Sequence, residues 1–243
     1  MTAISSINSD INLDNLYKNI QINNDIPFIE HGAYGYKGES IKNKRKSRNP
    51  EKKKTFFNQV TIHVNCDKNV NVKLFNNGKI QMTGLKYEDH GSNVLQKLLP
   101  IITELDSSNE SKVFNHNDIV YQPMNIVLIN SDFDIKYKVK RDILHREIVD
   151  AGMYSSYEPC IYPGVNIKYF FNSNQDNGIC KCLNICNGKG DGCSDGGCKK
   201  ITVAVFKSGK IIITGARSRQ QLELSYHFIT KFMNDRKEKI ELK

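Results

Sequence analysis

The 243-residue sequence has no tryptophan, few prolines and no long uncharged apolar segment. No apolar run approaches the roughly 18 residues of a membrane span, and the start of the chain lacks the apolar core of a secretory signal. Clustered carboxylates and a Ser/Cys/His arrangement for catalysis are also missing, and the six histidines are scattered. We therefore expect an intracellular, non-enzymatic protein with no membrane association and no small-molecule substrate.

Positive charge is present in excess and is concentrated in one segment. The formal net charge is +9, and nine Lys and Arg residues lie within residues 37–54, beside only Glu39 and Glu51. Such a run is typical of a solvated loop, of a nuclear-localisation signal, or of a surface that binds a polyanion. Clustered Lys and Arg are the feature expected of phosphate binding.

An internal repeat is the most informative pattern in the sequence. Residues 71–84 align without a gap with residues 202–215, and seven of the fourteen positions are identical. Each copy reads as a hairpin in which an apolar run ends at Phe, a polar turn contains Gly78 or Gly209, and a second apolar run ends at Thr-Gly. The chain therefore contains two copies of one structural unit.

Each hairpin belongs to a longer pattern of strands and helices. Apolar residues at helical spacing follow both hairpins, over residues 94–105 and 222–233. Strands are predicted before the hairpins at Phe57–Val64 and Val165–Phe171, and an opening strand and helix at residues 3–9 and 13–22. Each half is thus expected to run strand, helix, four strands and long helix, with an antiparallel sheet covered on one face.

Two segments of the second half carry a family resemblance. Residues 205–217, Val-Phe-Lys-Ser-Gly-Lys-Ile-Ile-Ile-Thr-Gly-Ala-Arg, resemble the second-repeat hairpin of the TATA-binding protein family. Residues 155–164, Ser-Ser-Tyr-Glu-Pro-Cys-Ile-Tyr-Pro-Gly, resemble its Ser-Ser-Tyr-Glu-Pro-Glu-Leu-Phe-Pro-Gly segment. The resemblance covers about residues 120–243 and 55–106. The insertions and composition indicate a divergent member, of a kind expected in a large DNA virus or an AT-rich protist.

The resemblance implies both a fold and a function. The fold is α+β: two pseudo-symmetric repeats, residues 1–115 and 116–243, form a saddle-shaped, curved antiparallel sheet with helices on its convex face. The function is a transcription initiation factor that binds and bends the minor groove of AT-rich promoter DNA and recruits a TFIIB-like factor and RNA polymerase. Its place of action is then the nucleus or a cytoplasmic virus factory.

The resemblance also assigns DNA-binding residues, against the alternatives of core packing for the aromatics and solvated charge for the lysines. The aromatic wedges between base steps are Phe57, Phe75, Tyr162 and Phe206. Asn125 matches a donor to the acceptors of the minor groove. Base-facing strand positions hold Gln81, Thr83, Val127, Ile212 and Thr214, and phosphate-contacting positions hold Lys79, Lys86, Lys168, Lys210 and Arg217.

Two insertions distinguish the chain from the family pattern. The basic run at residues 37–54 replaces a short loop before Phe57, and a second insertion occupies about residues 172–200. The second contains Cys180, Cys182, Cys186, Cys193 and Cys198, a density that favours a structural zinc site in a reducing compartment. Free thiols, or disulfides formed after isolation, are the alternatives, because the spacing is not a paired Cys-x-x-Cys knuckle.

Two rival functions remain beside the initiation factor. An enzyme of nucleic-acid processing would need a catalytic domain, and the repeats and insertions already account for the chain. A scaffold that binds proteins without bending DNA would use Glu158 and Ile161, which match the family's surface for a TFIIB-like factor. Lys73 and Ala204 favour that scaffold, since they replace apolar residues that support the wedges in the family.

Overall fold

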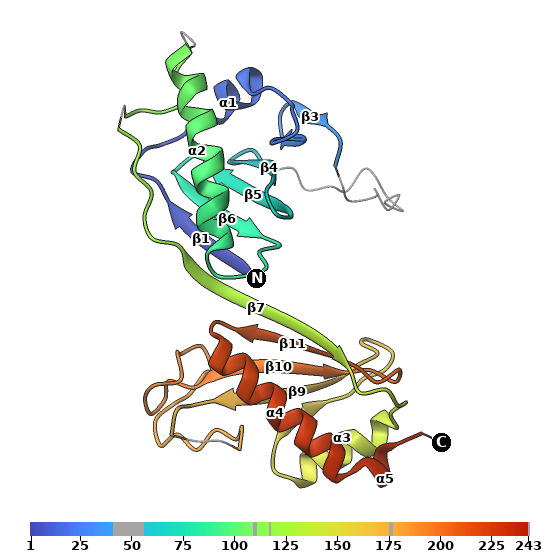
Figure 1. The fold of residues 1–243 in the computed structure, drawn as a ribbon. Coiled ribbons are helices and arrows are strands. Elements are labelled where there is room, and N and C mark those ends of the chain that lie inside the picture. The colour runs from blue at the N-terminus through green and yellow to red at the C-terminus, as the bar shows by residue number, and fades with distance from the viewer. Residues whose placement is uncertain (41–55, 109–110, 117, 175–176, 243) are drawn as a thin grey trace. The chain divides into compact units, whose positions relative to one another are not determined.

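The computed structural model describes residues 1–40, 56–108, 111–116, 118–174 and 177–242. The chain forms two compact units, Met1–Val127 and Leu128–Lys243, each with its own antiparallel sheet (Figure 1). The division predicted from the sequence lies between residues 115 and 116. Among the described residues, every helix is too short or too polar to cross a membrane.

As far as the structure describes it, the first unit consists of a six-stranded sheet and two helices. Its strands lie in the order β3-β2-β4-β5-β6-β1, and each neighbouring pair is antiparallel. The elements are β1 (Thr2–Ser6), α1 (Leu13–Asn19), β2 (Phe28–His31), β3 (Gly35–Gly38), β4 (Gln59–Asn65), β5 (Asn69–Phe75), β6 (Lys79–Thr83) and α2 (His90–Ser108).

The second unit repeats this plan with one strand fewer in its sheet. Its order is β7-β11-β10-β9-β8, again antiparallel throughout. The elements are β7 (Asn125–Asp134, which begins in the first unit), α3 (Arg141–Asp150), β8 (Tyr154–Ser156), β9 (Val165–Phe171), β10 (Lys199–Val205), β11 (Lys210–Ala216), α4 (Arg219–Asp235) and α5 (Lys237–Ile240).

Strict alternation along the strands sets the inner face of each sheet. In β5, Val70, Val72 and Leu74 are fully buried, whereas the residues between them are half-exposed. The buried side chains pack with the apolar face of α2, including Leu95 and Leu98. Each fully buried Val or Leu contributes about 1.5–3 kcal/mol, so this periodicity fixes which face of the sheet the helix covers.

The two hairpin turns have matching geometry. Gly78 and Gly209 have φ values of 74° and 88°, in the positive region that glycine adopts without strain. In both turns the glycine N–H donates to the preceding Phe carbonyl at 3.0 Å. A Cβ at Gly78 would lie 2.4 Å from the Ser9 carbonyl oxygen, and one at Gly209 would lie 2.2 Å from that of Tyr137. Both turns therefore require glycine.

The α+β class, with antiparallel strands and helices on one face, is confirmed. α2 contains Pro100 and continues beyond it to Ser108. Two details differ from expectation. The first opening helix ends at Asn19, because the next residue, Ile20, is already extended. The first unit also has five strands between its helices instead of four. β2 pairs with β4 as β8 pairs with β9, so β3 is the additional strand.

Candidate nucleic-acid interface

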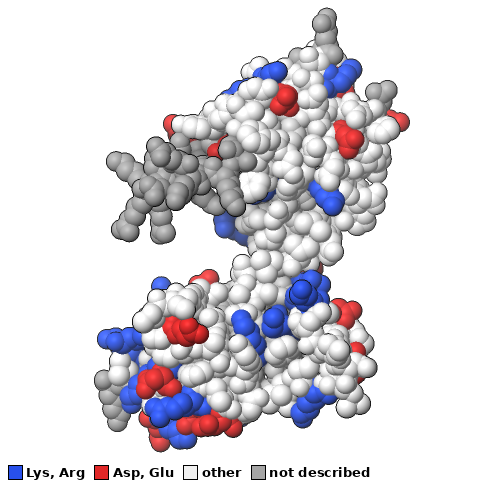
Figure 2. Space-filling view, turned by 180° about the vertical axis from the view of Figure 1, so that it is seen from behind, with Lys and Arg blue, Asp and Glu red and all other residues white. Residues whose placement is uncertain are grey.

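Within the part of the chain that the structure describes, each sheet has one face that no helix covers. Figure 1 draws α2 and α4 in front of their sheets, so Figure 2 views each unit from the open side. In the first unit this face presents Lys73 and Phe75 of β5 and the alternate residues Lys79, Gln81 and Thr83 of β6. The predicted base-facing residues Gln81 and Thr83 therefore share a face with the hairpin aromatic Phe75.

A hollow of about 330 Å³ lies beside Phe75 on the first unit. Ile4 of β1 stands opposite Gln81 in the sheet and is 42% exposed, unlike its buried neighbour Ala3. The lining residues are Ile4, Ser5, Ser6, Phe75, Lys79, Ile80, Gln81, Gln122, Pro123 and Asn125. Four predicted DNA-binding residues, Phe75, Lys79, Gln81 and Asn125, are thus brought together, whereas Val127 and Lys86 are not part of the lining.

The second unit has a corresponding hollow of about 450 Å³ beside Phe206. Its lining consists of Asn130, Ser131, Asp132, Phe206, Ser208, Lys210 and Ile212. Phe206, Lys210 and Ile212 were predicted to bind DNA, whereas Asn130 and Asp132 were not. Thr214 follows on the same face, and its hydroxyl donates to Asn130 Oδ1 at 2.6 Å.

The wedge candidates form a ring pair in the second unit. The ring centroids of Tyr162 and Phe206 are 5.8 Å apart in an edge-to-face arrangement, and Gly164 lets the chain pass close to both rings. In the first unit, Phe57 lies two residues before β4 and is 66% exposed. The first residue of β4, Gln59, pairs with Phe75. Phe57 is therefore attached to the strand that pairs with Phe75.

Lysine and arginine side chains gather on the open side of the second unit (Figure 2). Burial and then the neighbouring charge of Lys200 lower the pKa of the Lys168 ammonium, whose Nζ donates to Thr202 Oγ1 at 3.0 Å. Burial, Arg217 and Lys200 similarly lower the pKa of Lys199. The positive charges of these side chains repel one another, and a bound anion would offset that repulsion. Lys199 and Lys200 were missed because the sequence assigned them to the cysteine-rich insertion, whereas the structure places them at the start of β10.

Comparison with known proteins agrees with this arrangement. Residues 125–235 match the family model of transcription factor TFIID, or TATA-binding protein. A TATA-box-binding protein-like protein of Acanthamoeba polyphaga mimivirus is 32% identical over 207 residues, which cover 81% of this chain and 53% of that protein. The chain belongs to the TATA-binding protein family. This family is not enzymatic, as the sequence predicted.

Further relatives support the family and the fold. The TATA-box-binding protein of Dictyostelium discoideum is 26% identical over 149 residues, covering 61% of this chain and 53% of the relative. The chain therefore spans about half the length of these curated relatives. The structure of Methanococcus jannaschii TBP matches with a TM-score of 0.54 and 15% identity, covering 96% of this chain and 95% of that one.

A turn beside Tyr162 carries the two candidate partner-binding residues. The backbone N–H groups of Ile161 and Tyr162 both donate to the Glu158 carbonyl at 2.9 Å. Glu158 is exposed, and the Ile161 side chain is 80% exposed. The turn thus displays an acidic and an apolar side chain next to the ring pair of the TATA-binding-protein-like hairpin.

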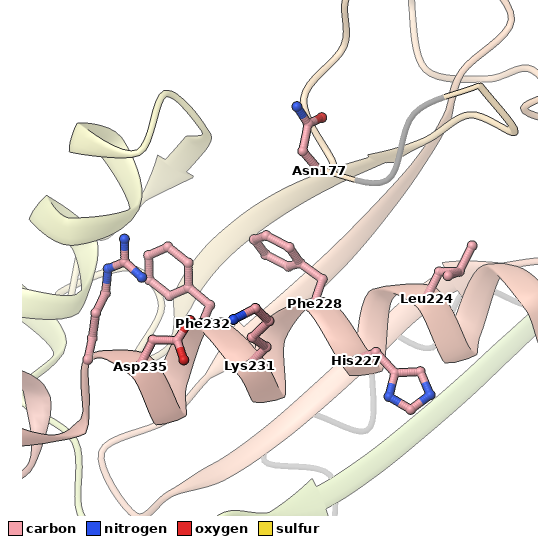
Figure 3. Close-up of a pocket in the computed structure, with 8 residues that line it drawn as sticks. Asn177, Leu224, His227, Phe228, Lys231, Phe232 and Asp235 are labelled. Carbon is pink, nitrogen blue, oxygen red and sulfur yellow. Dashed lines mark hydrogen bonds and ion pairs between the residues drawn. The ribbon is translucent and has the colours of Figure 1, made fainter.

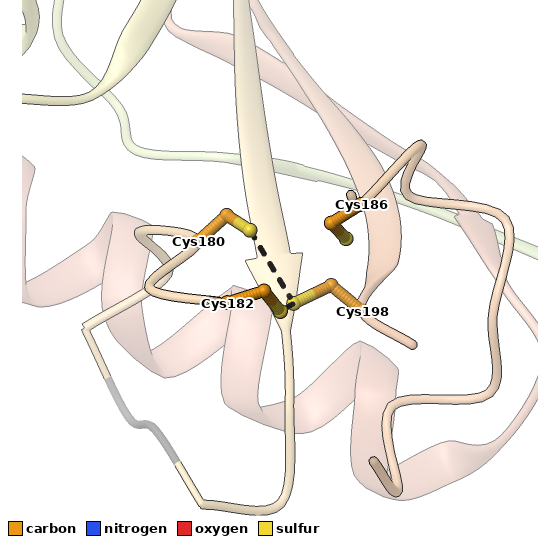
Figure 4. A group of neighbouring side chains, drawn as sticks. All are labelled: Cys180, Cys182, Cys186 and Cys198. Carbon is orange, nitrogen blue, oxygen red and sulfur yellow. Dashed lines mark hydrogen bonds between the residues drawn. The ribbon is translucent and has the colours of Figure 1, made fainter. Parts of the chain in front are cut away.

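The cysteine-rich insertion brings four of its five cysteines together (Figure 4). The sulfur atoms of Cys180, Cys182, Cys186 and Cys198 all lie within 4.8 Å of one another. Four thiolates held about 2.3 Å from a zinc ion in a tetrahedron lie roughly 3.8 Å apart, so the cluster fits that ion. Cys193, the fifth cysteine of the insertion, is exposed and lies outside the group.

The surroundings of the cluster support a metal-binding role. Asn172 Nδ2 donates to Cys198 Sγ at 3.6 Å, the type of outer contact that orients a thiolate ligand. Burial raises the pKa of the Cys198 thiol, and a metal ion would reverse this by stabilising the thiolate. Sequence spacing alone could not select these four cysteines, because the last ligand follows a glycine-rich loop and begins the approach to β10.

A loop between two of the cysteines exposes apolar side chains that sequence reasoning missed. Leu183 is 98% exposed and Ile185 is 100% exposed. The Asp195 carboxylate accepts from the backbone N–H groups of Leu183 and Asn184, both at 2.9 Å, and fixes the loop.

A second hollow lies on the helix-covered side of the second unit. It measures about 410 Å³, and Phe228 and Phe232 of α4 form much of its apolar wall (Figure 3). The charged groups at its rim are already paired: Lys231 with Asp235 at 2.9 Å, and Arg236 with Glu147 at 3.2 Å. This hollow holds none of the predicted site residues.

The predicted basic loop at residues 37–54 lies mostly outside the described residues. Its first member, Lys37, is described and belongs to β3. The Lys37 ammonium donates to the backbone carbonyls of Tyr17 and Lys18 at 2.6 and 3.0 Å. This lysine therefore serves the packing of α1 against the additional strand.

Proposed function

We propose that this protein is a transcription initiation factor that binds the minor groove of AT-rich promoter DNA with the open faces of its two sheets. The observation that carries the proposal is the matched pair of hollows, each beside a hairpin aromatic, Phe75 or Phe206, on a helix-free face. Family membership supports the same role. The site of action is the nucleus or a cytoplasmic virus factory.

The uncharged side chains of these faces would contact the bases. The minor groove of A·T pairs offers only the acceptors A N3 and T O2. Asn125 and Gln81 can donate to these acceptors, while Thr83, Thr214, Val127 and Ile212 provide a surface without strong charge. Apolar and hydroxyl groups suit a widened groove that must lose its water.

The aromatic side chains act as wedges that unstack base steps. Phe75 with Phe57 would open one step, and Phe206 with Tyr162 the other, which requires exposed rings next to the sheet. Minor-groove proteins use such wedges to kink DNA, at a cost of a few kcal/mol per step. The expected bend of about 80° is taken over from TATA-binding protein itself.

Lysine and arginine at the rims contact phosphate. Lys79 and Lys86 would do so in the first unit, and Lys168, Lys210 and Arg217 in the second. Phosphate contacts position a protein on DNA without reading its sequence. Lys200 of β10 extends this basic rim in the second unit, because it shares a face with Thr202, the partner of Lys168.

Glu158 and Ile161 would bind a TFIIB-like factor, which in turn recruits RNA polymerase. Their exposure on one turn supports this role. The second candidate function, a protein-binding scaffold that does not bend DNA, is favoured by Lys73 on the open face opposite Gln81. In the family this position holds an apolar residue that packs against a wedge aromatic, and a lysine would support that aromatic less well.

We also propose that the cysteine cluster holds one structural zinc ion. Cys180, Cys182, Cys186 and Cys198 would be its ligands, and the ion would tie the insertion to the start of β10. A site with four protein ligands is closed, so its role is to stabilise the fold.

Fluorescence energy transfer between the labelled ends of an AT-rich duplex tests the wedges. Wild-type protein should bend the duplex by about 80°, and Phe75→Ala with Phe206→Ala should remove most of that bend. The control is Tyr226→Ala, since Tyr226 lies on α4 and contacts Phe133 on the helix-covered side. Tight binding by the wild type with no bend would favour the scaffold instead.

A further inference from the structure

An acidic side chain lies on the open face of the second unit. Asp132 of β7 stands directly opposite Ile212 of β11, and both are exposed. The next residue, Phe133, points to the other side, where its ring contacts Tyr226 of α4 at 4.8 Å between centroids. Since neighbouring residues of a strand face opposite sides, Asp132 belongs to the proposed DNA-binding face.

Asp132 lines the same hollow as the wedge Phe206. Within the described part of the chain, the Asp132 carboxylate has no hydrogen bond or ion pair. The other acid of this strand end, Asp134, differs, because its Oδ1 accepts from the Lys136 backbone N–H at 2.7 Å. Asp132 therefore offers unused acceptors beside the step that Phe206 would open.

The corresponding position in the first unit is uncharged. In the first unit, Gln81 of β6 occupies the position of Ile212, and its partner Ile4 of β1 occupies the position of Asp132. In the first unit the polar residue of the pair therefore lies on the hairpin strand, whereas in the second unit it lies on the opposite strand. The first hollow can donate and accept through an amide, whereas the second presents a carboxylate that can only accept.

Nearby groups complement this acceptor. Asn130 Oδ1 already accepts from the Thr214 hydroxyl, so the Asn130 Nδ2 group is the part available to donate to a base. Asn130 and Asp132 are two residues apart on one strand and line one hollow. The face therefore offers a donor and, beside it, a charged acceptor.

In the minor groove only guanine presents a donor, its N2 amino group; A·T pairs present acceptors alone. An A·T pair opposite Asp132 would leave a desolvated carboxylate facing acceptors, which is costly. A G·C pair would supply a charge-assisted hydrogen bond. We propose that Asp132 selects a G·C base pair beside the step opened by Phe206, in the half of the site bound by the second unit. This inference rests on the proposed DNA binding.

Duplexes that differ by one amino group test the proposal. A single G·C pair is moved through an AT-rich duplex, and at the best position it is replaced by inosine·C, which lacks the N2 amino group, or by A·T. We expect wild-type protein to bind the G·C duplex about tenfold more tightly than either replacement, equivalent to about 1.4 kcal/mol. Asp132→Ala should reduce that ratio to about one, mainly by improving binding to A·T.

Asp134→Ala is the matched control, because it removes an equal charge from the same strand and should keep the preference. Equal wild-type affinity for G·C and inosine·C at every position would overturn the inference while leaving DNA binding intact. Asp132→Ala that tightens binding to all duplexes alike would also overturn it, since the carboxylate would then only repel phosphate. Failure of the wild type to bind any duplex would overturn the proposed function, and the inference with it.

Discussion

The two units share their hairpins and differ in what is attached to them. Both have a turn glycine with positive φ, an aromatic residue at the end of the first hairpin strand and a hollow beside it. The first unit adds β3, whereas the second adds a loop with four clustered cysteines. The shared parts are those proposed to contact DNA, so the duplicated geometry marks the common function and the additions mark what is particular to each half.

The largest expected difference between the units is metal content. Cys180→Ser should abolish binding of one zinc ion, since a structural site of this type contributes about 10–16 kcal/mol of binding free energy. Cys193→Ser is the matched control and should retain the metal, because Cys193 lies outside the cluster. Elemental analysis of protein purified without added zinc measures both. Wild-type protein with no zinc and five reactive thiols in the insertion would contradict the proposed site.

The turn glycines test whether the hairpins are equivalent. Gly78→Ala and Gly209→Ala should each reduce the free energy of unfolding by about 2–4 kcal/mol, through positive-φ strain and overpacking. Gly35→Ala should cost only about 1 kcal/mol. Gly35 also has positive φ, but a Cβ there would meet no atom within 4 Å. Denaturant unfolding measures all three, and equal costs at Gly78 and Gly35 would show that the close approach is unimportant.

Salt dependence compares the two basic rims. Lys79→Ala with Lys86→Ala, or Lys168→Ala with Arg217→Ala, should each flatten the slope of log affinity against log salt by about 1.8, because each lost phosphate contact removes about 0.9. Between 50 and 200 mM salt, about a tenfold difference in affinity follows. Lys231→Ala on α4 should change nothing, as it pairs with Asp235 away from the open face. A flattened slope in only one pair would mean that the units contact phosphate unequally.

The smallest expected effect is a pH dependence confined to the second unit. Burial and Lys200 lower the pKa of Lys168, so this ammonium loses its charge as pH rises, below the roughly 10.4 of an ordinary lysine. DNA affinity should then fall by up to about fivefold, the effect of one partly screened charge. Lys168→Arg stays protonated and should remove this fall in titrations up to pH 10. An identical pH profile for wild type and variant would remove Lys168 from the DNA contacts.

Local patterns explain why much of the fold could be predicted from the sequence. The alternation Val70, Val72, Leu74 defines a strand with one buried face wherever it occurs, and a glycine between two such runs defines a turn. β9 matches its predicted bounds for the same reason. β3 was not predicted, because Gly35–Gly38 is short and exposed and is held only by its pairing with β2.

The position of Asp132 shows where alternation fails. Ile126 packs against the first core and Ile129 is buried in the second, so inward-facing residues of β7 are three apart at this point. A register shift between Thr214 and Ala216 of the paired strand accompanies the change. Extending the alternation from Asn125 and Val127 would place Ser131 on the open face and Asp132 inside, which is the reverse of the structure.

The duplicated hairpins, their turn glycines and aromatics, and the family could all be predicted from the sequence, because each depends on residues close together in the chain. The structure was needed to show which four cysteines meet, which lysines share a rim, and that a carboxylate lies beside Phe206. These arrangements depend on pairing between distant strands, where one shift of register exchanges the two faces of a strand.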